Sequence, residues 1–84
     1  MKLINVGEDI KSLILAGIDP LVNEYMFDLK MLINQLASFF ARLEREGKIV
    51  WWQFVAPSRD IIVEVTLRKR NVLEMIEVRI SDLP

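Results

Sequence analysis

The hydrophobic pattern changes its period at Gly47, and this change constrains the fold more than any other feature of the sequence. From Pro20 to Glu46, apolar residues recur on a heptad step, as they do along one face of a helix. After Gly47, β-branched and aromatic residues are frequent and apolar positions tend to alternate with polar ones. The sequence therefore predicts a helical first half followed by a second half built of strands.

A short helix is predicted at the start of the chain, over about residues 8–16. Asn5 is suited to cap it, and Gly17 is typical of the left-handed residue that follows a helix. The pattern of residues 1–6 is equally compatible with a short strand at the edge of a sheet.

A long amphipathic helix is predicted over about residues 20–46. Asp19 and Pro20 favour a helix start, because aspartate caps free N–H groups and proline needs none at the first helical position. No further glycine or proline occurs before Gly47, which is the expected stop.

Three strands are predicted after this helix, over about residues 48–56, 60–68 and 72–80, joined by turns at Pro57–Asp60 and Lys69–Val72. Antiparallel pairing across these turns places apolar residues opposite one another on one face, which the long helix should cover. The prediction is an α+β fold of the type ααβββ, with the helix on a three-stranded antiparallel meander. The expected pairs are Ala56 with Ile61, Phe54 with Val63, Trp52 with Val65, Val50 with Leu67, Val65 with Ile76, Val63 with Val78 and Ile61 with Ile80.

The other face of the predicted sheet is also partly apolar. Alternation assigns to it Ile49, Trp51, Gln53, Val55, Ile62, Leu73 and Met75. Three explanations stay open: the short N-terminal helix covers this face, the face is a subunit interface anchored by tryptophan, or it is a patch that binds a ligand. The candidate interface residues are Tyr25, Met26, Phe39, Phe40, Trp51 and Met75.

Composition favours an oligomer. The 84 residues are predicted to form a single domain, residues 1–84, and 52% of them are hydrophobic. A domain of this size buries only about 60–65% of its unfolded surface, so a second chain is an effective way to cover the rest. The sequence therefore predicts self-association, with a dimer as the first expectation and another protein as a further partner.

Composition also excludes several functions. The chain has no Cys and no His, which removes thiol and imidazole catalysis and the usual transition-metal ligands. We predict no enzyme activity and no cofactor. No apolar run approaches the roughly 20 residues of a membrane span. We expect a cytoplasmic protein, and the abundance of Glu, Lys and Arg without Cys or His is typical of thermophiles.

Basic residues are expected to gather where the long helix ends and the second turn lies. Such a cluster is either an ordinary charged surface near a helix C-terminus or a contact for phosphate or nucleic acid. The candidate patch consists of Arg45, Lys48, Arg68, Lys69 and Arg70.

Leu36–Leu67 resembles the end of a winged-helix DNA-binding domain, in which a recognition helix leads into a two-stranded wing. The residues that carry the resemblance are Leu43-Glu44-Arg45-Glu46-Gly47-Lys48-Ile49-Val50, with Pro57–Asp60 as the wing tip carrying Arg59. The resemblance implies three helices, over residues 8–16, about 20–28 and about 32–46, and a nucleic-acid-binding regulator. Our first expectation is a non-catalytic assembly or adaptor module, and this regulator is the alternative.

Overall fold

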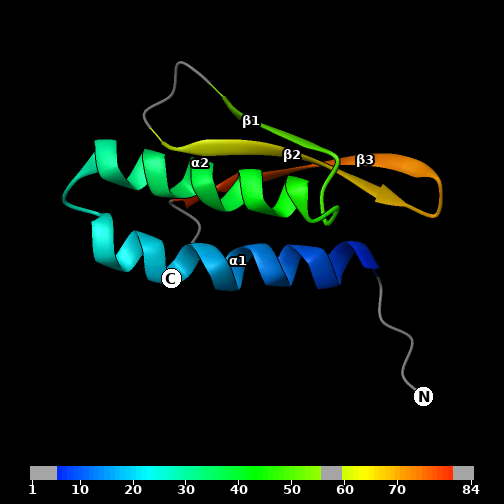
Figure 1. Cartoon of the computed structure of the whole chain (residues 1–84), viewed down its shortest axis with the longest axis horizontal. Helices are drawn as coiled ribbons and strands as arrows, with labels where there is room; N and C mark the ends of the chain where they lie inside the picture. Colours follow the sequence, from blue (N-terminus) through cyan, green and yellow to red (C-terminus); the bar gives the residue numbers. More distant parts are fainter. Residues whose placement is uncertain (1–5, 56–59, 81–84) are drawn as a thin grey trace.

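Two helices and three antiparallel strands make up the protein, in a computed structural model that describes residues 6–55 and 60–80. The elements are α1 (Val6–Tyr25), α2 (Leu29–Arg45), β1 (Trp51–Val55), β2 (Ile62–Lys69) and β3 (Val72–Arg79). The sheet has the order β1-β2-β3, and both helices pack on one of its faces (Figure 1). The predicted α+β fold, with helices on a three-stranded meander, is confirmed. The expected cap Asn5 and residues 1–5 of the alternative strand lie outside the described ranges.

Helix α1 runs through both signals that were predicted to interrupt it. Gly17 lies inside the helix, and the ring of Phe39 packs so close to it that a Cβ atom there would lie 2.4 Å from Cε1 and Cζ of that ring. Pro20 also lies inside the helix. Apolar residues on either side of Pro20, including Ile18 and Val22, pack into the core. The predicted helix end at Gly17 and helix start at Pro20 are wrong, because tertiary packing outweighs these local signals.

A turn divides the predicted long helix over residues 20–46. Asp28 caps α2, since its Oδ1 accepts a hydrogen bond from the N–H of Met31 at 3.1 Å. Its own N–H donates to the carbonyl of Tyr25 at 2.9 Å, which closes the turn. A single helix would be about 40 Å long, whereas a strand of eight residues is only about 27 Å long. Two antiparallel helices cover the sheet better than one that overhangs it, so the single long helix is wrong.

The division into three helices that the winged-helix resemblance implies is not found either. Within the described residues there are two helices, and α1 spans both the range 8–16 and most of the range 20–28 without a break.

The predicted stop at Gly47 is confirmed by a closed hydrogen-bond pattern. Gly47 has a φ of +77°, a conformation that glycine adopts without strain. Its N–H donates to the carbonyl of Glu44 at 3.0 Å, and the N–H of Lys48 donates to the carbonyl of Leu43 at 2.9 Å. This pair of bonds is the Schellman motif, which satisfies the last carbonyls of α2.

The predicted strand register is confirmed on the face that the helices cover. Trp52 lies opposite Val65 and Phe54 opposite Val63, while Val65 and Val63 lie opposite Ile76 and Val78. Helices and sheet enclose one apolar core, whose buried residues are Ile14, Ile18, Leu32, Leu36, Phe39, Phe40, Leu43, Ile49, Val63, Val65, Leu67 and Val78.

The alternation is interrupted immediately before β1. The N–H of Val50 donates to the carbonyl of Thr66 at 2.8 Å, and Trp51 lies opposite the same Thr66. Two residues facing one is the arrangement of a β-bulge. The extra residue puts Ile49 into the core and leaves Val50 exposed. The prediction that Ile49 lies on the outer face and that Val50 faces Leu67 is therefore wrong.

Candidate functional site

The candidate site is the face of the sheet that points away from both helices, which we call the open face. Within the described residues, α1 packs against α2 and the inner face of the sheet, so the suggestion that the first helix covers the open face is wrong. The open face consists of Trp51, Gln53, Val55, Ile62, Glu64, Thr66, Arg68, Leu73, Met75, Glu77 and Arg79.

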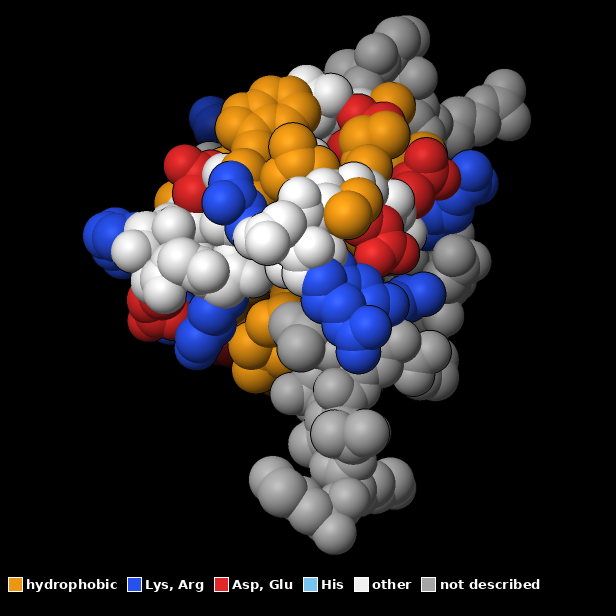
Figure 2. Space-filling model, turned by 90° about the vertical axis from the view of Figure 1, so that its right-hand side faces the viewer, with side chains coloured by type: hydrophobic (Ala, Val, Ile, Leu, Met, Phe, Trp, Pro, Cys, Tyr) orange, Lys and Arg blue, Asp and Glu red, His pale blue; other side chains and the backbone are white. Residues whose placement is uncertain are grey.

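Three large apolar side chains of the open face are well exposed. The exposed fractions of Trp51, Leu73 and Met75 are 48%, 59% and 62%. Trp51 and Met75 lie opposite Thr66 from either side, so these three residues form one row across the sheet. Hydrophobic side chains gather in the upper part of Figure 2, next to acidic and basic groups. An apolar patch with a polar rim on an exposed sheet is typical of an interaction surface.

The charged residues of the open face lie on either side of this apolar row. On one side, Gln53 Nε2 donates a hydrogen bond to Glu64 Oε1 at 2.6 Å. Farther along the same strand is Arg68, which has no ion pair among the described residues and is exposed. Arg79 Nε donates to Glu77 Oε1 at 2.8 Å on the same side of the row as Glu64, because Glu77 lies opposite Glu64. The face therefore carries both signs of charge at separate positions.

The candidate interface residues that lie on α1 and α2 are not part of the open face. Phe39 and Phe40 are core residues with exposed fractions of 8% and 0%, so we remove them from the candidate interface. Tyr25 and Met26 lie at the turn between the helices, at the opposite end of the molecule from the β2–β3 turn (Figure 1). Phe27 in this same turn is 94% exposed, and the heptad pattern concealed this because it assigned the turn to a helix.

The basic residues come together at one end of the molecule, as expected. The end of α2, the start of β1 and the β2–β3 hairpin lie at that end, and the hairpin extends beyond both helices (Figure 1). Arg45, Arg68 and Arg70 are exposed and Lys69 is half-buried. Lys48 Nζ lies 3.1 Å from Glu46 Oε1, which partly neutralises it. Within the described residues, most of the cationic groups at this end that lack an ion pair are therefore on the hairpin.

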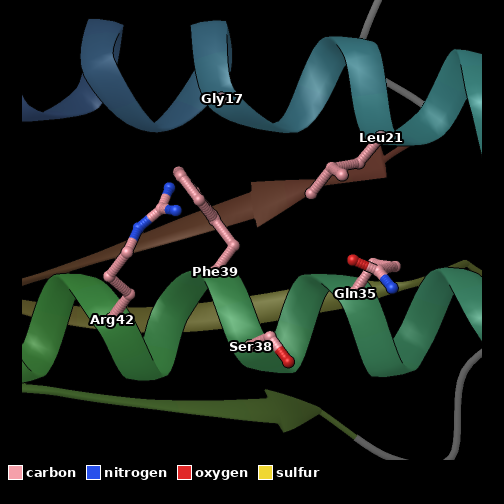
Figure 3. Close-up of a pocket in the computed structure, with 6 residues that line it drawn as sticks. All are labelled: Gly17, Leu21, Gln35, Ser38, Phe39 and Arg42. Carbon is pink, nitrogen blue, oxygen red and sulfur yellow. The ribbon is translucent and has the colours of Figure 1, made fainter.

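A shallow hollow between the helices is the second place where a ligand could be considered. It is lined by Gly17, Leu21, Gln35, Ser38, Phe39 and Arg42 (Figure 3). Phe39 and Arg42 point from α2 toward α1, and the guanidinium carbon of Arg42 lies 5.6 Å from the centre of the Phe39 ring. Its volume of about 180 Å³ is below the roughly 300–1,000 Å³ of sites that enclose small molecules. Helix packing around Gly17 accounts for this hollow.

Two further observations concern metals and membranes. Among the described residues, no three acidic side chains are grouped so that they could hold a metal ion. Neither α1 nor α2 combines the length and the apolar character needed to cross a membrane.

Comparisons with known proteins give no information about the function of this chain. No family model matches the chain, and neither a curated protein nor a solved structure matches it. The open face and the basic hairpin are therefore the two features that bear on function.

Proposed function

We propose that the protein is a non-catalytic assembly module that associates with itself through the open face. The observation that carries the proposal is that this face holds Trp51, Leu73 and Met75, all about half exposed or more, while the described helices pack on the opposite face. Tryptophan and methionine are enriched in protein interfaces, and tryptophan is among the most frequent energetic anchors. Covering these side chains with a second copy would remove their apolar area from water.

The size of the core supports the same proposal. The described core has one layer of helices on one side of a small sheet, so the strands are buried on a single face. A domain with so little interior gains stability when a partner covers its second face, because a partner that binds only the folded chain adds further buried surface to that of the core.

The proposal is tested by measuring molar mass over a range of concentrations by light scattering, for the wild type and for Trp51→Glu. We expect a dimer or larger assembly that Trp51→Glu dissociates, since a carboxylate in the middle of an apolar contact would lose its hydration. The control is Phe27→Glu, which makes the same kind of change at an aromatic residue far from the open face. Dissociation by Phe27→Glu but not by Trp51→Glu would place the contact at the helix turn and contradict the proposal.

The second candidate function is that of a nucleic-acid-binding regulator, and the projecting hairpin favours it. Arg68 and Arg70 are exposed there, next to Lys69. Arg70 adopts a φ of +51°, a conformation that costs a long side chain of this type roughly 1 kcal/mol or more. A stability cost at the tip of a basic hairpin is compatible with selection for contacts with phosphate groups.

This second candidate makes a distinct prediction about salt. The slope of log affinity against log salt is negative, and each lost phosphate contact reduces its steepness by about 0.9. Replacing Arg68, Lys69 and Arg70 together by Ala should therefore weaken binding to a DNA or RNA duplex and make the slope less steep by up to about 3. An assembly module should show no binding at moderate salt, with or without this change.

A further inference from the structure

We infer that two copies stack open face against open face with their strands antiparallel, so that Arg68 of each copy pairs with Glu64 of the other. The inference rests on the proposed self-association and adds the geometry of the contact. The two-fold axis lies between the two sheets and is perpendicular to the strands. It runs along the row formed by Trp51, Thr66 and Met75.

On the middle strand β2, two opposite charges lie symmetrically about this row. We call Trp51, Thr66 and Met75 the central row, because they lie side by side on β1, β2 and β3. On β2, Glu64 lies two residues before Thr66 and Arg68 lies two residues after it. Both side chains share the face of Thr66, since alternate residues of a strand point the same way. The two opposite charges are therefore equally far from the central row.

The charges distinguish two ways of placing a two-fold axis over the central row. If the axis ran along the strands, Glu64 would face Glu64 of the second copy and Arg68 would face Arg68. If the axis runs across the strands, each strand faces its own counterpart in the reverse direction. Arg68 then faces Glu64 twice, while Trp51 faces Trp51 and Met75 faces Met75. Because like charges face to face are strongly unfavourable, the charge pattern selects the second arrangement.

The distances allow this contact. Two residues along a strand span about 7 Å, and packed sheets lie about 10 Å apart. The strands of two aligned sheets are rotated by about 30° relative to each other. A side chain that lies about 7 Å from the axis is therefore displaced by about 4 Å from the position directly opposite its partner. The length of an arginine side chain can bridge such an offset.

Existing contacts leave these two groups available. Arg68 has no ion pair among the described residues. Glu64 accepts one hydrogen bond, at Oε1 from Gln53, and this bond holds the carboxylate on the open face. A carboxylate can accept further bonds, including those from a guanidinium group. Each copy thus offers one donor and one oriented acceptor at matching distances from the axis.

The experiment uses charge reversal in separate chains. Arg68→Glu alone places two acidic groups opposite each other, and Glu64→Arg alone places two basic groups opposite each other. We expect each variant to lose self-affinity by at least about tenfold, from the cost of facing like charges. An equimolar mixture of the two should form a heterodimer, because Glu at 68 meets Arg at 64 and the native pair remains on the other side. Native mass spectrometry and light scattering measure both results.

Two controls keep the outcomes distinct. The chain that carries both changes should dimerise like the wild type, and circular dichroism checks that each variant is folded. Glu24→Arg reverses one charge on the exposed surface of α1 and should leave the dimer intact.

The outcomes separate this inference from the proposed function. A wild type that stays monomeric at every concentration overturns both. A wild-type dimer that Trp51→Glu dissociates, but whose mixed charge variants form no heterodimer, overturns the stacking geometry and leaves the open face as the contact. Loss of the homodimer in each variant alone, together with a heterodimer in the mixture, supports the geometry.

Discussion

The close approach of α1 and α2 at Gly17 leads to a prediction with an unusual sign. In a helix interior, replacing glycine with alanine normally stabilises by about 1 kcal/mol. At Gly17 the added Cβ atom would lie 2.4 Å from Cε1 and Cζ of Phe39, far inside contact distance, so the ring must move. Overpacking of this kind costs about 1–3 kcal/mol. We therefore expect Gly17→Ala to lower the free energy of unfolding by about 1 kcal/mol, within a range of roughly 0–2 kcal/mol.

Removing the ring should reverse the sign of this effect. Phe39→Leu keeps an apolar side chain and eliminates the two atoms that meet the new Cβ. In that background Gly17→Ala should raise the free energy of unfolding by about 1 kcal/mol, so the coupling between the two sites is about 2 kcal/mol. Urea unfolding followed by tryptophan fluorescence measures all four proteins, because Trp52 stacks on Phe40 at a ring-centre distance of 5.7 Å and reports on the core.

A neighbouring position supplies the reference. Ala16 is exposed on the same helix, so Ala16→Gly measures the propensity difference without contact with a ring, about 1 kcal/mol destabilising. If Gly17→Ala stabilised the wild type by this full amount, or had the same effect with Leu at position 39, the packing of Phe39 against α1 would be refuted.

Three further changes test individual contacts by equilibrium unfolding. Asp28→Ala removes the cap on the N–H of Met31 and should destabilise by about 1 kcal/mol, whereas Asp28→Asn should cost little. Arg70→Asn combined with Asn71→Gly should stabilise the hairpin by about 1 kcal/mol, because both positions have positive φ and Asn-Gly suits this turn; a loss of stability would contradict the turn geometry. Phe40→Ala should cost about 3–5 kcal/mol, since its side chain is completely buried, and a loss below 1 kcal/mol would argue against its central position.

The strand half could be predicted down to individual pairs, apart from the bulge before β1, whereas the helical half could not. For strands, alternation and turn length act together, and a shift of one residue would have turned Val63 and Val65 outward. For helices, Gly17 and Pro20 favour an interruption locally, yet the chain continues because the core continues. Asp28 is a good cap, but it is surrounded by apolar residues and gave no visible break in the heptad pattern.

The candidate site was predictable where it depends on alternation and not where it depends on helix orientation. Trp51 and Met75 were assigned to one face of the sheet, and the structure places them there. Phe39 and Phe40 belong to a broad helical stripe, and only the position of α1 decides that both are covered. Ile49 was misplaced because a bulge depends on the hydrogen bonds of its neighbours and has no signature in the hydrophobic pattern.

The order of the elements along the chain is nearly their order in space, and this has a consequence for how the protein folds. Helix α1 packs on α2, β1 pairs with β2, and β2 pairs with β3. Contacts between sequence neighbours close short loops, which costs little chain entropy and is associated with rapid folding. The contact of α1 with β2 spans the longest separation among the main contacts, so we expect the docking of α1 onto the strands to be the late step. A newly made chain can therefore pair its strands and pack α2 on them before α1 closes the core.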